Sequence, residues 1–322
     1  MLQKPSSVAG PSGLGHFLWW RRPAPDAAKA APRQKSVQSP GRIALRRLWH
    51  STTAMGAIVI MAALILMAVA APLLAPYDPN AILPGASLAA PSRTFLFGGD
   101  VIGRDVLSRV IFGARISLTV GLICVAISLS VGTLLGLLAG YFGGQIDNII
   151  MRIVDMLLAF PGILLALTVV SVLGPGIFNM MIAVGISGIP NFARLVRGSV
   201  LCAKENVYVE AAHCVGCSNW RIMLRHILPN IVAPITVLSS LTYGWAILNA
   251  ASLSFLGLGA QPPTAEWGVM LSDGRTYLRD APWLTVFPGL AIIISVLAAN
   301  LLGDGLRDAL DPHLQQCRTT EQ

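Results

Sequence analysis

Six apolar stretches of membrane-spanning length constrain the fold more than any other feature of this 322-residue sequence. A hydrocarbon layer roughly 30 Å thick is crossed by about 20 residues of helix, whose backbone groups pair within the segment. The chain is 54% hydrophobic and only 12% charged, unlike a soluble domain. It therefore predicts an all-α integral membrane protein with six transmembrane helices. They are expected at 54–75, 116–141, 149–173, 177–196, 231–256 and 284–302.

The positions of the basic residues predict the orientation. The segment before the first expected span holds Lys4, Arg21, Arg22, Lys29, Arg33, Lys35, Arg42, Arg46 and Arg47, opposed only by Asp26. Basic residues near the end of a span keep that end in the cytoplasm. Both termini of a six-span chain are then cytoplasmic, and the basic loop between spans four and five lies on the same side. The loops 76–113 and 257–282 are expected outside.

Composition divides the chain into four segments. Residues 1–45 are rich in Pro, Ala, Ser and basic residues without apolar periodicity, which predicts a disordered basic cytoplasmic tail. Residues 46–113 hold the first transmembrane helix and an extracytoplasmic loop, 114–313 a five-helix core with a cytoplasmic loop at 199–229, and 314–322 a C-terminal tail. The first apolar run is too long and too far from the start for a signal peptide, so we expect it to be retained.

Small residues and a proline predict local packing within the spans. Gly132, Gly136 and Gly140 are spaced by four, so they share one helix face and allow another backbone to approach. Packing within one bundle is favoured over a contact between subunits. Pro161 is expected to kink the third span, either for a pathway or only for packing.

Ionisable side chains are almost absent from the middle of the expected spans. Arg152 and Asp155 lie near the start of the third span and are expected to pair with each other. Proton-coupled or sodium-coupled transporters need buried acidic groups, which this pattern does not supply. The energy for any transport is therefore expected to come from another protein.

No motif predicts catalysis, a cofactor or a metal. The spacing 98–105 mimics a phosphate-binding loop, yet Arg104 and Asp105 stand where lysine and a hydroxyl residue would be needed. Cys214 and Cys217 form only half of a zinc site, because no second pair follows. We expect no catalytic residue, and no nucleic-acid partner because the basic residues flank spans.

The polar segment 208–229 between two apolar spans is the strongest candidate site. Helix formers surround Glu210, Ala211 and Ala212, Gly216 permits a turn, and 220–228 is expected to form a second short helix. Pro229 is expected to close that helix and open the fifth span, where its missing donor costs little. The helix-turn-helix is interpreted either as a docking knob for a partner protein or as an amphipathic helix on membrane lipid.

Several motifs resemble one family of transport proteins. They are Gly103–Arg109, Leu138–Gly144, Ile150–Asp155, Ser254–Pro263, Glu266–Gly268 and Gly303–Pro312. From about 41 to 313 the chain resembles the second, C-type permease subunit of dipeptide, oligopeptide and nickel ABC importers. The spacing of Glu210, Ala211, Ala212 and Gly216 resembles the Glu-Ala-Ala loop of such permeases. The stretches 159–166, 192–198 and 224–229 look most like the glutathione-importing branch.

The resemblance implies a type I ABC importer permease fold in the bacterial cytoplasmic membrane. The implied partners are a homologous permease subunit, two cytoplasmic ATPase subunits that bind the ATP, an extracytoplasmic solute-binding protein and a peptide cargo. Glu210, Ala211, Ala212 and Gly216 would then lie on a helix that couples to an ATPase. Cys214 and Cys217 depart from the family pattern. A permease for nickel or another small solute and a stand-alone secondary transporter or channel are the alternatives.

Overall fold

The described part of the chain is built of α-helices, with one isolated β-bridge between Gly99 and Asp105. This computed structural model describes residues 48, 49 and 51–310, all within the unit Pro40–Gln322. The tails expected at 1–45 and 314–322 lie outside the described residues, as do 46–47 and 311–313 of the two segments between them.

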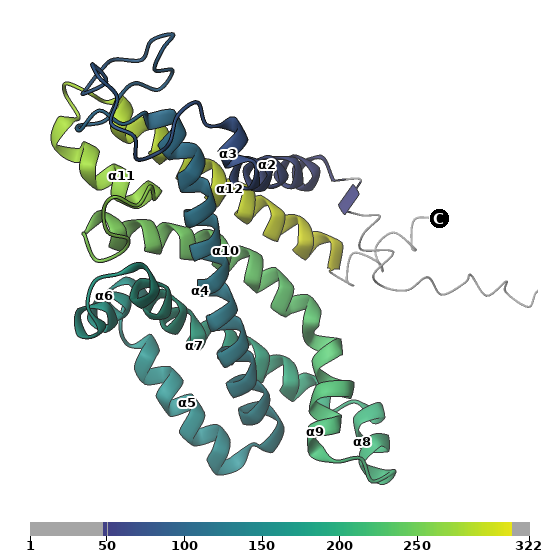
Figure 1. The fold of residues 1–322 in the computed structure, drawn as a ribbon. Helices are drawn as coiled ribbons and strands as arrows, with labels where there is room; N and C mark the ends of the chain where they lie inside the picture. Colours follow the sequence, from purple (N-terminus) through teal and green to yellow (C-terminus); the bar gives the residue numbers. More distant parts are fainter. Residues whose placement is uncertain (1–47, 50, 311–322) are drawn as a thin grey trace, which may run out of the picture. The chain divides into compact units, whose positions relative to one another are not determined.

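The helices follow one another through short loops, apart from the long segments before α4 and between α10 and α12 (Figure 1). In order they are α2 (Thr52–Val69), α3 (Ala71–Leu74), α4 (Val106–Phe142), α5 (Gly144–Leu158), α6 (Gly162–Leu173), α7 (Ile177–Lys204), α8 (Val207–Cys214), α9 (Asn219–Arg221), α10 (Val232–Phe255), α11 (Trp267–Gly274) and α12 (Trp283–Leu310).

Several of these helices can cross a membrane. Within the described residues four qualify by length and composition: α2, α4, the helical run Asn219–Phe255, and α12. The pair α5 and α6 adds a fifth if both helices belong to one span. The fourth expected span, 177–196, corresponds to α7, which has the length but is not among the helices that qualify. The described part of the chain is thus that of an all-helical membrane protein with four to five candidate spans.

The third expected span is broken rather than kinked. The sequence predicts one helix over 149–173, but α5 ends at Leu158, α6 begins at Gly162, and the two are bent by 93°. Pro161 lies at the break with an extended backbone, ψ 131°. Proline has no N–H for the preceding turn and disfavours a helical residue before it, so the break falls here. The sequence therefore predicted the position of the distortion at Pro161 correctly but underestimated the size of the bend.

The prediction that Pro229 ends a short helix is wrong. Helical turns continue from α9 through a π-helical segment, Ile222–Ile227, and a 3-10 turn, Leu228–Ile231, into α10. Pro229 lies in the first turn of the 3-10 segment. The change from wide π-helical turns to a tight 3-10 turn at this point accommodates a residue without an N–H. The hydrogen-bond pattern therefore changes here, but the helix continues.

Helices α4 and α7 approach closely at the three glycines expected to share one face. A Cβ built on Gly136 would lie 2.6 Å from the carbonyl oxygen of Ala193, and Cβ atoms on Gly132 and Gly140 would come within 2.5 and 2.8 Å of α7 side chains. Real Cβ atoms essentially never come this close. The small residues of α4 therefore face a neighbouring helix of the same chain.

Ion pairs tie α5 to α7. Arg197 contacts Asp147 through two hydrogen bonds, the longer one 2.6 Å, and Arg194 Nη2 lies 2.6 Å from Asp155 Oδ1. The expectation that Asp155 pairs with Arg152 is therefore wrong. Residues three apart on one helix are neighbours, but the long Arg194 side chain from α7 reaches this carboxylate instead.

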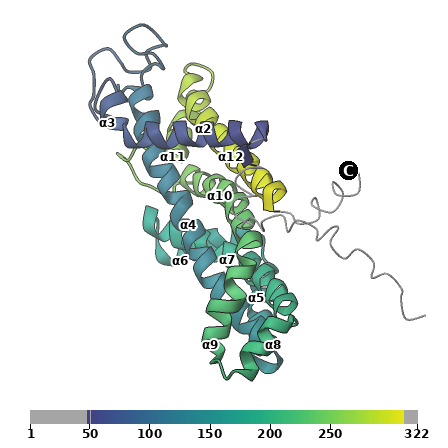
Figure 2. The same ribbon diagram turned by 90° about the vertical axis from the view of Figure 1, so that its right-hand side faces the viewer.

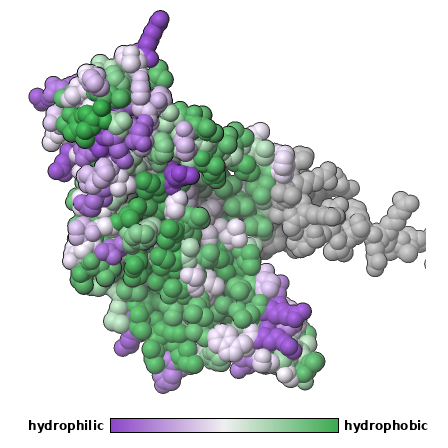
Figure 3. Space-filling view, in the orientation of Figure 1, coloured by the Kyte–Doolittle hydropathy of each residue, from purple (hydrophilic) through white to green (hydrophobic). Residues whose placement is uncertain are grey.

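Polar residues gather near the two ends of α4. Figures 1 and 2 both place the long loop and α11 beside the start of α4, and α8 and α9 beside its end. Figure 3 shows hydrophilic residues in both places and a largely hydrophobic surface between them. The 37 residues of α4 span about 55 Å at 1.5 Å per residue, which exceeds the thickness of a membrane core.

Candidate functional site: the loop between α7 and α10

Only two of the eight residues of helix α8, Val209 and Ala212, are buried. Both belong to an apolar cluster that includes Ile222 and Ile227 of the π-helical segment. The π-helical segment thus holds α8 in place by apolar burial, the main favourable contribution to packing.

The rest of α8 is exposed. Val207, Glu210, Ala211, Cys214 and the following Val215 are spaced by three, one, three and one, so they share one face of the helix. Val207 and Val215 are 79% and 82% exposed, so this face presents two open apolar side chains. This outward face, 207/210/211/214/215, is small, apolar and carries a single carboxylate.

Gly216 ends α8 in a defined turn. Its φ is +80°, and its N–H donates to the His213 carbonyl while the Cys217 N–H donates to the Ala212 carbonyl. This pair of bonds is the Schellman motif, in which a left-handed residue satisfies the last carbonyls of a helix. No atom lies within 4 Å of a Cβ built on Gly216, so a side chain there would strain the backbone without a collision.

The residues predicted from the sequence occupy different positions in this loop. Glu210 and Ala211 lie on the outward face, Ala212 is buried beneath it, and Gly216 forms the turn. Pro229 is exposed, in the helical run that leads into α10.

A hydrogen-bonded contact that the sequence analysis missed joins the loop to the end of α4. The Tyr141 hydroxyl donates to Asn219 Oδ1 at 2.9 Å and lies 3.3 Å from His213 Nε2. The Lys204 ammonium also donates to the Gly140 carbonyl at 3.3 Å. A tyrosine at the end of a span was the available signal, although its partners lie more than 70 residues away.

Polar side chains and a cavity surround α8. A cavity of about 520 Å³ lies beside α8, bordered by Tyr141, Lys204, Glu210 and His213 among others. Cys214 is exposed and Cys217 half-buried, both as free thiols. Among the residues the structure describes, no group of three or more His, Cys, Asp or Glu side chains could hold a metal ion.

Comparison with known proteins identifies the family. Residues 132–316 match the family described as binding-protein-dependent transport system inner membrane component, and 39–91 match the N-terminal transmembrane domain of oligopeptide transport permease C. The chain is 49% identical over 297 residues to the glutathione transport system permease protein GsiD of Pectobacterium atrosepticum, covering 92% of this chain and 99% of that one.

Two further similarities agree with this assignment. The chain is 47% identical over 282 residues to the dipeptide transport system permease protein DppC of Alkalihalophilus pseudofirmus, covering 88% of this chain and 93% of that one. A solved structure of the MetNI methionine ABC transporter has the same fold, with a TM-score of 0.51 at 16% identity over 63% of this chain and 96% of that one. The chain therefore belongs to the binding-protein-dependent transport system inner membrane components, as a non-catalytic, multi-pass permease of an ABC transporter that works with an ATPase and a binding protein.

Proposed function

We propose that this permease imports peptides across the cytoplasmic membrane, with glutathione among its cargoes. Relatives named for glutathione and dipeptide transport are 47% to 50% identical to this chain over nearly its whole length, which supports a peptide cargo. In the proposed assembly it pairs with a homologous permease, and two ATPase subunits bind beneath the pair.

The proposed topology has six crossings, with α7 as the fourth and the α5–α6 pair together as the third. Both termini and the α8 loop are then cytoplasmic, and the loop before α4 and α11 lie outside. Three basic residues in the C-terminal part of α7, Arg194, Arg197 and Lys204, and two in the loop after it, Arg221 and Arg225, support this orientation. Within this scheme 1–45 is a cytoplasmic tail, 46–113 the first span and outer loop, 114–313 the transport core and 314–322 a second tail.

The outward face of α8 carries the proposed coupling to the ATPase. Two exposed valines flank Glu210 and Ala211 there, and burying each valine in a partner's groove would contribute about 1.5–3 kcal/mol. Ala212 keeps the helix close to its support, and Gly216 sets the turn that makes the knob short. The exposure of Val207 and Val215, on a loop whose Val209 and Ala212 are buried against the protein, is the observation that favours docking over a role at the lipid surface.

Motion of the loop has two physical routes into the spans. The helical run Asn219–Phe255, in which Pro229 lies, is continuous, so displacement of α9 passes directly into α10. The Tyr141 hydrogen bonds pass it to the end of α4. Closure of the ATPase pair around ATP would thereby tilt both helices and change the side to which the pathway opens.

Reconstituted transport tests the proposal. The permease pair, the ATPase subunits and the binding protein are placed in vesicles, and uptake of labelled glutathione, trialanine and ⁶³Ni²⁺ is measured. We expect uptake of at least one peptide that requires both ATP and the binding protein. Uptake of nickel alone would favour the nickel-permease alternative, and flux through this chain without ATPase subunits would establish a channel or secondary transporter.

A further inference from the structure

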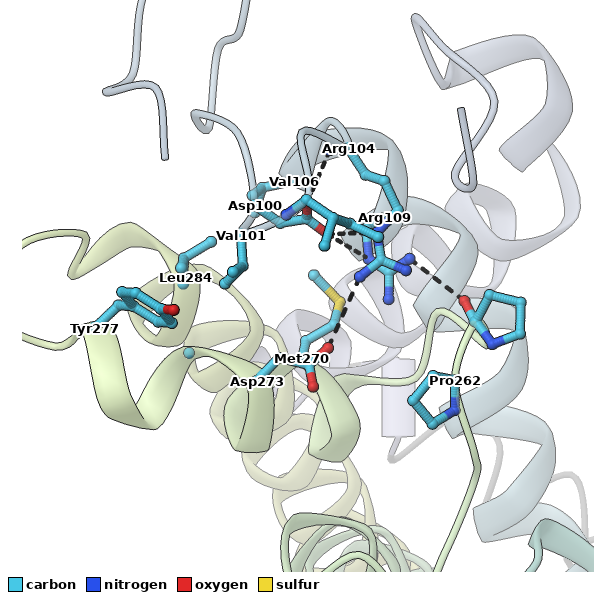
Figure 4. Close-up of a pocket in the computed structure, with 13 residues that line it drawn as sticks. Asp100, Val101, Arg104, Val106, Arg109, Pro262, Met270, Asp273, Tyr277 and Leu284 are labelled. Carbon is cyan, nitrogen blue, oxygen red and sulfur yellow. Dashed lines mark hydrogen bonds and ion pairs between the residues drawn. The ribbon is translucent and has the colours of Figure 1, made fainter. Parts of the chain in front are cut away.

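A cavity of about 380 Å³ lies at the start of α4, at the end opposite the α8 loop (Figure 4). Its walls come from the loop 100–104, from α4, from Pro262 and Pro263, and from α11 and α12. This volume falls within the range of small-molecule sites, roughly 300–1,000 Å³. Four charged side chains line it together with Met270 and Tyr277.

The charges in this cavity balance. Arg104 Nε lies 2.5 Å from Asp100 Oδ2, Arg109 Nε lies 3.8 Å from the same oxygen, and Arg104 Nη2 lies 3.8 Å from Asp273 Oδ2. The Arg109 and Arg104 side chains are only 2% and 9% exposed, whereas that of Asp273 is 42% exposed. The two arginines and two aspartates therefore form a neutral group with one open carboxylate.

The two guanidinium groups retain unused donors. Arg109 donates through Nη1 to the carbonyls of Pro79 and Pro263, at 3.2 and 3.4 Å, and Arg104 donates through Nε to Asp100. Their remaining terminal nitrogens make no hydrogen bond to the described residues, although each guanidinium has five N–H donors.

These unused donors border open space. Among the described residues, Thr133 Oγ1 is the single buried side-chain nitrogen or oxygen without a hydrogen-bond partner. The unpaired nitrogens of Arg104 and Arg109 are consequently not sealed in the packed interior. Figure 4 shows both guanidinium groups and the Asp273 carboxylate gathered in the same part of the cavity.

We propose that this cavity binds a zwitterionic peptide, with its carboxylate on Arg104 and Arg109 and its ammonium group on Asp273. The cavity offers two positively charged donors and one negatively charged acceptor, and its net charge is zero. It therefore matches a ligand that carries both a carboxylate and an ammonium group. A simple anion or cation would use only half of the cavity's charged groups. Charge-assisted hydrogen bonds are the strong class, and bidentate arginine–carboxylate pairs add geometric selectivity.

The apolar walls complete the match. Met270, Tyr277, Leu284 and the Pro262–Pro263 turn offer nonpolar surface to the peptide between its charged ends. The inference rests on the proposed function, because it assumes a peptide cargo and places the cavity outside the membrane. It adds that the permease itself holds the peptide before translocation, in addition to the binding protein.

Direct binding tests this inference. The assembled permease–ATPase complex, without the binding protein, is placed in nanodiscs and equilibrated with labelled glutathione and trialanine, each compared with its N-acetyl form. For the peptide shown to be carried in the uptake assay, we expect saturable binding that is weakened about tenfold by N-acetylation, since an ion-paired hydrogen bond is lost.

Two substitutions separate recognition from folding. Asp273→Asn should lower affinity for the free peptide about tenfold and leave that for the N-acetyl form unchanged, a pattern that a misfolded cavity would not produce. Arg104→Gln should weaken both forms. Asp280→Asn, the same change at an exposed aspartate outside the cavity, serves as the control and should bind as the unsubstituted protein does.

The outcomes distinguish the two proposals. Peptide uptake that is normal in the full system, without any binding to the complex, would overturn the cavity assignment and leave the import function standing. Loss of binding-protein affinity in Asp273→Asn, with no peptide bound, would make the cavity a docking point for the binding protein and would also overturn it. Absence of peptide uptake altogether would contradict the import function instead.

Discussion

The two ends of α4 differ in how their polar groups are used. At the start of the helix, Glu266 is 2% exposed and accepts hydrogen bonds from the Gly268 and Val269 N–H groups and the Ser117 hydroxyl. Beyond its end, Glu210 projects into solvent from α8. The Glu266 carboxylate is committed to the fold and the Glu210 carboxylate is exposed, so the same residue type supports the structure in one place and belongs to the proposed docking face in the other.

Trp267 adds to the buried contacts at the start of α4. It is fully buried, donates through Nε1 to the Val110 carbonyl at 3.0 Å, and packs where Gly113 leaves room. The loop that enters α11 is thus anchored on α4 by an aromatic ring and a buried carboxylate. The α8 loop is held by apolar contacts beneath it and by hydrogen bonds of the Tyr141 and Tyr208 hydroxyls, an attachment that fits the proposed docking role.

Alanine at the two glutamates should separate these roles with the largest effect. Glu266→Ala leaves three donors without an acceptor, so we expect the free energy of unfolding to fall by roughly 3 kcal/mol or more. Glu210→Ala should change it by less than about 0.5 kcal/mol. Denaturation of the purified proteins in detergent measures both; equal losses would show that the contrast is wrong.

Alanine at two glycines tests whether the connection between these ends is as tightly packed as the structure shows. Gly136→Ala places a Cβ 2.6 Å from a backbone oxygen of α7 and should destabilise the protein by about 1–3 kcal/mol. Gly198→Ala on α7 is the matched control, because no atom lies within 4 Å of its Cβ. It should stabilise by about 0.5–1 kcal/mol through helix propensity. Similar thermal midpoints for the two variants would contradict close packing of α4 on α7.

Tyr141→Phe removes the hydroxyl that links the α8 loop to α4 and keeps the ring. We expect a loss of about 0.5–1.5 kcal/mol in unfolding free energy, the usual contribution of a hydrogen bond. The number of peptides carried per ATP hydrolysed should fall as well, because one of the two routes for motion is weakened. Tyr77→Phe, at a tyrosine before α4 whose hydroxyl makes no hydrogen bond to the described residues, provides the comparison. An unchanged ratio in Tyr141→Phe would remove α4 from the coupling route.

The pH dependence of peptide binding gives the smallest effect. Burial raises the pKa of Asp273 above its ordinary value, while the facing Arg109 and Arg104 lower it and Asp100 raises it. A protonated Asp273 cannot pair with an ammonium group, so affinity for a free-ended peptide should decline on acidification from a higher pH than an ordinary aspartate would give. Equilibrium binding between pH 7 and 4 measures this. Asp273→Asn should flatten the difference between free and N-acetyl peptides; persistence of the difference would exclude Asp273 as its source.

Sequence reasoning located local features well because they depend on near neighbours. The four-residue spacing of Gly132, Gly136 and Gly140 placed them on one face, and Gly216 marked a turn. It underestimated the break at Pro161, since a missing donor indicates where a helix is interrupted but not that the chain will bend by 93°. It also ended a helix at Pro229 that a change of turn type allows to continue.

Sequence reasoning could not predict the long-range contacts. Asp155 pairs with Arg194 instead of its helical neighbour Arg152. The cavity is lined by Arg104 and Arg109 and also by Asp273, which lies more than 160 residues later in the sequence. Such pairs depend on how the helices pack, which periodicity does not specify. The resemblance to a permease family pointed to the proposed coupling loop, and the structure added which of its residues are exposed.

Crosslinking from the outward face of α8 tests the central claim most directly. In a background whose native cysteines are replaced and which retains uptake, Ala211→Cys is labelled with a photoreactive maleimide in the assembled complex. Leu278→Cys, exposed near α11, is the control. We predict a product with the ATPase subunit from position 211, with a yield that changes when ATP is added, and none from position 278. An intact complex without a product from 211, or with equal products from both positions, would contradict the account.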